Sequence, residues 1–132
     1  MAERRTTRRV FLAAAGVAAA SAATAKLLGG GEDRRHEELT RRVAAAFGDL
    51  AAARAVGAAY LRSRPAEADE RRLVRELRRA SRRWPEVSLP ADVRRLARAE
   101  ARRDYAAGRL AVVDGWYLSQ TEGRLCALTT FA

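Results

Sequence analysis

Few residues of this chain carry side chains that commonly do chemistry, and they lie far apart in the sequence. His36 is the single histidine and Cys126 the single cysteine, and they fall in different predicted helices with no carboxylate cluster at ligand spacing near them. A zinc site needs three or four such ligands, so the sequence predicts no metal site. Ser119 lacks the flanking glycines of a hydrolase nucleophile, and the glycine run at residues 29–31 follows no strand and opens no phosphate-binding loop. We therefore expect no catalytic residue and no cofactor.

Ser119 and Cys126 have structural interpretations instead. Ser119 and Glu122 have the spacing of a capping box, in which each side chain bonds the other residue's backbone N–H at the start of a helix. Cys126 follows Leu125 in that apolar helix, where a free cysteine usually packs as a small hydrophobic side chain. The alternative for an exported thiol, a disulfide to another chain, stays open.

The first 25 residues have the pattern of an export signal. A basic start is followed by an uncharged run at residues 10–25 and by small residues at its end. The spacing of Arg8, Arg9, Phe11 and Leu12 matches the twin-arginine motif, although Ala13 stands where lysine is frequent. We expect the twin-arginine translocase to carry the chain to the periplasm or to the outer face of the inner membrane. Several cleavage sites overlap, so the sequence leaves open an uncleaved signal that keeps the chain in contact with the membrane.

The charge of the chain is strongly basic, with 26 Lys+Arg against 16 Asp+Glu and a net charge of +10. Arginine and alanine are over-used together, which indicates a compositional bias of the source genome. The arginines alternate with acidic residues instead of forming a basic stripe with interleaved aromatic residues, the pattern typical of nucleic-acid binding. We therefore expect no nucleic-acid partner, and mainly solvated arginine faces.

Beyond the signal segment, residues 26–32 read as a flexible glycine-rich lead-in, and residues 33–132 as one helical domain. Asp33 is expected to cap the first helix, whose apolar residues recur at three- and four-residue spacing. Gly48 and Asp49 either lie inside this helix or end it and cap a second one that runs to Arg62. The sequence does not decide between the two.

Prolines and capping residues divide the middle of the domain. Arg64 precedes a proline and is expected to end the second helical segment. Asp69 is expected to cap a helix over residues 70–83, and residues 84–90 form a connector. Pro90 suits the first turn of a long helix that ends at Gly108, where a left-handed cap favours glycine.

A β-hairpin is predicted over residues 110–118. Asp114 and Gly115 between two apolar runs indicate a type I′ turn, which pairs Val113 with Trp116. In this register one face, expected to be buried, carries Ala111, Val113, Trp116 and Leu118. The sequence thus predicts a mainly α fold, a small helical domain of four to five helices with one C-terminal β-hairpin. Three aromatic residues, Trp84, Tyr117 and Phe131, are the candidates for an exposed interface.

The segment DYAAGRLAVVDGWYLSQTEGRLCAL, residues 104–128, resembles the C-terminal region of small bacterial twin-arginine-exported proteins of uncharacterised function. In size and signal the chain is also similar to the small subunits of periplasmic flavin-dependent dehydrogenases. Neither resemblance supplies a catalytic residue. Together they imply a non-catalytic exported partner protein, a small subunit or signal-carrying escort of a larger periplasmic oxidoreductase. The alternative is a stand-alone envelope protein, retained at the membrane by an uncleaved signal.

Overall fold

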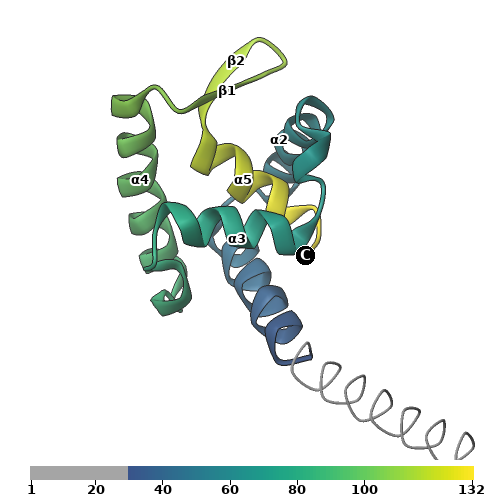
Figure 1. Cartoon of the computed structure of the whole chain (residues 1–132), viewed down its shortest axis with the longest axis vertical. Coiled ribbons are helices and arrows are strands. Elements are labelled where there is room, and N and C mark those ends of the chain that lie inside the picture. The colour runs from purple at the N-terminus through teal and green to yellow at the C-terminus, as the bar shows by residue number, and fades with distance from the viewer. Residues whose placement is uncertain (1–29) are drawn as a thin grey trace, which may run out of the picture. The chain divides into compact units, whose positions relative to one another are not determined.

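A computed structural model describes residues 30–132, and residues Arg35–Ala132 form one compact unit (Figure 1). The export-motif residues Arg8, Arg9, Phe11 and Leu12 lie outside the described residues. In chain order, the described elements are a helix over residues 30–46, α2 (Leu50–Ser63), η1 (Pro65–Glu67), α3 (Glu70–Ala80), η2 (Trp84–Glu86), α4 (Pro90–Ala107), β1 (Leu110–Val113), β2 (Trp116–Ser119) and α5 (Gln120–Thr129). Five helices and one C-terminal hairpin confirm the predicted fold class.

The chain breaks between the first two helices, which answers the question that the sequence left open. The first helix ends at residue 46, and the Asp49 side chain accepts a hydrogen bond from the backbone N–H of Ala52 at the start of α2. The expected start of the first helix is wrong, because residues 30–32 are already helical and Asp33 does not cap it. A glycine in a helix costs about 1 kcal/mol, which weakens a helix without excluding one.

The predicted helix over residues 70–83 is shorter in the structure. Asp69 caps α3 as expected, but α3 ends at Ala80 and Ser81 has an extended backbone. The Ser81 hydroxyl accepts a hydrogen bond from the Arg83 N–H, which stabilises the turn out of the helix. This early end allows Trp84 to enter the core, where it is fully buried.

The last helix lies at the centre of the compact unit. In Figure 1, α5 runs between α2 and α4, and α3 crosses it. A Cβ atom at Gly57 of α2 would lie 2.1 Å from the backbone oxygen of Cys126, and one at Gly123 of α5 would lie 2.4 Å from the Tyr60 ring. The two glycines therefore allow α2 and α5 to approach closely. The largest fully buried side chains of the described residues are Tyr60, Leu73, Leu77, Trp84, Leu96 and Leu128.

The hairpin has the predicted turn and register. Val113 pairs with Trp116, and Asp114 and Gly115 both have positive φ, 49° and 80°. The prediction for its buried face is wrong at one position: Ala111 and Val113 are buried, whereas Trp116 is 75% exposed. The part of α2 beside the turn carries short side chains, including Ala55 and Ala59, which are too small to cover an indole ring.

Tyr105 of α4 is exposed, although a large aromatic side chain at this spacing from Ala101 could lie on the core face of the helix. Glu100 and Asp104 of the same helix are buried instead. These two carboxylates follow Leu96 at four-residue intervals, so they share its face of the helix.

Candidate functional site

Three of the six large apolar residues that are exposed within residues 30–132 lie on the hairpin. Val112 is 55%, Trp116 75% and Tyr117 68% exposed. We call these three residues the hairpin surface. Val112 and Tyr117 are a cross-strand pair, and Trp116 projects from the opposite side of the ribbon. Both sides of the hairpin near its turn therefore offer large apolar side chains to solvent.

An apolar groove lies beside the hairpin surface. It has a volume of about 480 Å³ and lies between α2 and the hairpin. Its walls include Val56 and Ala59 from α2 and Val113, Trp116 and Tyr117 from the hairpin. Apolar surface that is concave and bordered by aromatic side chains is typical of a protein-binding surface.

Hydrogen bonds to buried groups hold the base of the hairpin. The Ser119 hydroxyl accepts from the Glu122 N–H at 2.9 Å, and the Glu122 carboxylate accepts from the Ser119 N–H at 2.8 Å. These bonds confirm the predicted capping box. Asp104 adds a second cap, because its carboxylate accepts from the Thr121 N–H at 2.8 Å and from Nε of Arg109 at 2.9 Å. The hairpin is thus fixed to the start of α5 and to the end of α4.

The sequence interpretation missed the role of Asp104. Burial raises the pKa of this carboxyl group, but hydrogen bonds from Thr121 and the nearby positive charge of Arg109 lower it more, so the pKa lies below its ordinary value. A charged carboxylate therefore accepts these bonds at neutral pH. The signal that could have identified it is the four-residue spacing from Leu96, which places Asp104 on the core face of its helix.

A second polar cluster, partly buried, joins α2, η1 and α5. The Tyr60 hydroxyl donates to the Glu67 carboxylate at 2.7 Å, and Arg124 donates to both oxygens of this carboxylate at 3.1 Å. The Arg64 guanidinium lies 5.6 Å from the centre of the Tyr60 ring and donates to the Leu110 carbonyl oxygen at 3.3 Å. This cluster links the second helix to the base of the hairpin and to the last helix.

The electrostatics of this cluster indicate a structural role. Burial raises the pKa of Glu67, but hydrogen bonds from Arg124 and Tyr60 lower it more, so the net change is downward. Burial and the hydrogen bond to Glu67 raise the pKa of Tyr60. Glu67 stays ionised and fully bonded while Tyr60 stays protonated, so neither group is placed to exchange protons at neutral pH.

Cys126 has the environment of an inert thiol. It is half-buried, and burial together with the charge of Glu122 raises its pKa to about 11. A thiol with this pKa is protonated at neutral pH and is a poor nucleophile. Within residues 30–132 no group of three or more His, Cys, Asp or Glu side chains is arranged to hold a metal ion.

The three aromatic residues predicted as an interface do not come together. Trp84 is fully buried, so its prediction as an exposed residue is wrong. Tyr117 and Phe131 are both exposed. They flank α5 at its two ends, and a helix of ten residues is about 15 Å long. Trp116, not Phe131, is the aromatic neighbour of Tyr117.

Comparison with known proteins finds no family model, no curated protein and no solved structure that matches this chain. Among the helices in the described part of the chain, none is both long and apolar enough to span a bilayer.

Proposed function

We propose that this chain is a non-catalytic exported partner protein that binds a larger protein through its hairpin surface. The observation that carries the proposal is the exposure of Trp116 and Tyr117 beside an apolar groove, on a hairpin fixed at its base by buried hydrogen bonds. Aromatic side chains that are exposed in a free subunit and held in place contribute much of the energy of protein interfaces.

The larger protein is proposed to be a periplasmic oxidoreductase. The twin-arginine route carries proteins that are already folded, which commonly means that a cofactor or a subunit was assembled in the cytoplasm. The pattern at Arg8 and Arg9 is present on a chain with no cofactor motif of its own. These features fit a small subunit that supplies the export signal for a larger catalytic chain.

Affinity purification from the periplasm of cells that express the neighbouring genes tests the binding. We expect a larger complex whose second chain is the product of a neighbouring gene without a signal of its own. Combined Trp116→Ala and Tyr117→Ala substitutions should abolish the complex and leave the protein folded. Phe131→Ala is the matched control, because it removes an exposed aromatic ring at the other end of α5. A complex that survives the double substitution would refute binding through the hairpin surface.

Export is tested separately by replacing Arg8 and Arg9 with lysine. The expected result is accumulation of the chain in the cytoplasm, measured by immunoblotting of cell fractions, because the translocase recognises the arginine pair. Normal periplasmic levels of the double variant would contradict the proposed route.

The alternative proposal is a stand-alone envelope protein retained by an uncleaved signal. It predicts that the protein is recovered alone, from the membrane fraction, with residues 1–25 still detectable by mass spectrometry. A soluble periplasmic complex from which these residues are missing would contradict this alternative.

A further inference from the structure

A basic cavity lies away from the hairpin surface. It has a volume of about 500 Å³, is open to solvent, and is bordered by the helix over residues 30–46 and by the segment from the end of α3 to η2. The first helix contributes residues at positions that follow one face of a helix, namely Arg35, Glu38, Leu39 and Arg42. The opposite wall carries Arg78, Arg82 and Pro85.

The charges around this cavity are unbalanced. Four arginines and one glutamate line it, a formal charge of +3. Glu38 forms an ion pair with Arg42, which also donates to the Val87 carbonyl oxygen at 3.4 Å. The single carboxylate of the lining is therefore already engaged at one edge.

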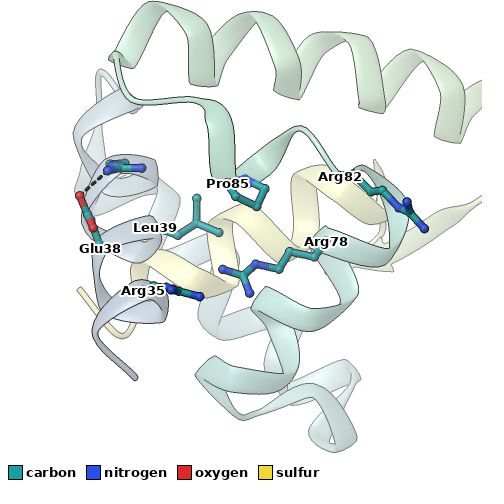
Figure 2. A pocket seen from close by; sticks show the side chains of 7 residues that line it. Arg35, Glu38, Leu39, Arg78, Arg82 and Pro85 are labelled. Carbon is teal, nitrogen blue, oxygen red and sulfur yellow. Dashed lines mark hydrogen bonds and ion pairs between the residues drawn. The ribbon is translucent and has the colours of Figure 1, made fainter. Parts of the chain in front are cut away.

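Of the three remaining arginines, Arg35 and Arg78 face the inside of the cavity. Figure 2 shows the Arg78 guanidinium reaching from α3 toward Leu39 and Arg35, with Arg35 turned toward it, while Arg82 points away. Nε of Arg78 is buried and has no hydrogen-bond acceptor. Within residues 30–132, neither Arg35 nor Arg78 forms an ion pair with a carboxylate. Two like charges thus face one cavity without a counter-charge between them, an unfavourable arrangement that a bound anion would relieve.

We propose that this cavity binds a phosphate monoester, with the phosphate between Arg35 and Arg78. The planar fork of a guanidinium donates two parallel hydrogen bonds to an oxyanion, and two forks match the two charges of a phosphate monoester. A carboxylate would balance only one of them. The cavity is larger than a phosphate group, and the apolar side chains of Leu39 and Pro85 can contact the organic part of the ester.

Titration calorimetry of the full chain with inorganic phosphate and with glycerol 3-phosphate, at about pH 8, tests the proposal. We expect saturable binding, tighter for both phosphates than for acetate at equal ionic strength. Arg78→Gln and Arg35→Gln should each weaken phosphate binding by about tenfold or more. Arg75→Gln is the matched control, because Arg75 is exposed on the same helix, lies outside the cavity and carries the same charge.

The comparison among variants separates a site from a general charge effect. An equal loss of binding in Arg75→Gln, or no saturable binding by the parent chain, would overturn the proposal. Circular dichroism checks that each variant is folded. If Arg78→Gln does not fold, the exposed Arg35 decides the question, because its substitution removes no buried group.

The phosphate could belong to a free metabolite or to a lipid headgroup, and sedimentation with vesicles distinguishes the two. Vesicles of phosphatidylcholine with and without phosphatidic acid are used for the parent and variant chains. Binding to phosphatidic acid that Arg78→Gln weakens and glycerol 3-phosphate displaces identifies a lipid ligand. Vesicle binding that is unchanged in Arg78→Gln, together with phosphate binding that is lost, identifies a free phosphate ester.

Discussion

The two tryptophans of this chain have opposite environments, although each directly follows a turn. Trp84 is fully buried because α3 ends early and η2 directs its ring into the core. Trp116 is exposed because the neighbouring residues of α2 are too short to cover it. The sequence predicted the reverse for both rings, because the hairpin register places Trp116 on the face expected to be buried and Trp84 was a candidate for an exposed interface.

Substitution of each tryptophan should separate their roles. Trp84→Ala is expected to lower the free energy of unfolding by about 3–5 kcal/mol, because it leaves a cavity in the core. Trp116→Ala should change it by no more than about 0.5 kcal/mol. Urea denaturation of both variants measures the difference. A loss of 2 kcal/mol or more in Trp116→Ala would show that the ring packs against the domain, and would remove it from the hairpin surface.

At the scale of elements, the close contact of α2 and α5 determines how the helices are arranged. The backbone of α5 passes so near Gly57 that a methyl group there would overlap the Cys126 carbonyl group. Gly123 makes equivalent room for the Tyr60 ring. Each glycine therefore serves a contact with the other helix, where the usual helical preference would favour alanine.

Gly57→Ala should destabilise the protein despite the better helix propensity of alanine. Overpacking of this kind typically costs about 1–3 kcal/mol, and here the obstacle is backbone, which cannot rotate away. Gly48→Ala is the control, because nothing lies within 4 Å of a Cβ atom at that position. Thermal melts should show a lower midpoint for Gly57→Ala alone. Equal midpoints for the two variants would mean that α2 and α5 are further apart than described.

Local signals predicted most of the elements, and long-range contacts account for what they missed. Asp49, Asp69, Ser119 and Gly108 end or begin helices through bonds within a few residues, so their roles are visible in the sequence. The Glu67 pair with Arg124 spans 57 residues, and no local spacing indicates it. Arg35 and Arg78 likewise come to face one another only because the helix over residues 30–46 and α3 pack together.

At the scale of the whole molecule, the Glu67 carboxylate connects segments that are remote in the chain. It accepts from Tyr60 of α2 and from Arg124 of α5, and Arg124 also lies 4.0 Å from Glu76 of α3. The pKa of Glu67 lies below its ordinary value in the folded protein. The unfolded chain therefore binds more protons than the folded protein when the pH falls below about 5.

This linkage predicts how stability depends on pH. The contribution of Glu67 should be complete above the unfolded pKa of about 4.3, and should be lost as the pH falls through the lower pKa of the folded state. Glu67→Gln should cost about 1–3 kcal/mol at pH 7, because the charged bond from Arg124 is weakened. The difference from the parent should shrink below about pH 4. Urea midpoints of both proteins across this pH range measure the difference in stability. A difference that stays constant with pH would mean that folding does not lower the pKa of Glu67.

The central position of α5 also bears on when the chain can fold during synthesis. The helices α2 and α3 bury their inner faces against α5, which the ribosome makes after them, and the Thr129 and Ala132 carbonyl oxygens accept from Arg54 of α2. The helices α2 and α3 therefore cannot complete their packing until α5 has been made. On the proposed export route, α5 must therefore be made before there is a folded cargo to move.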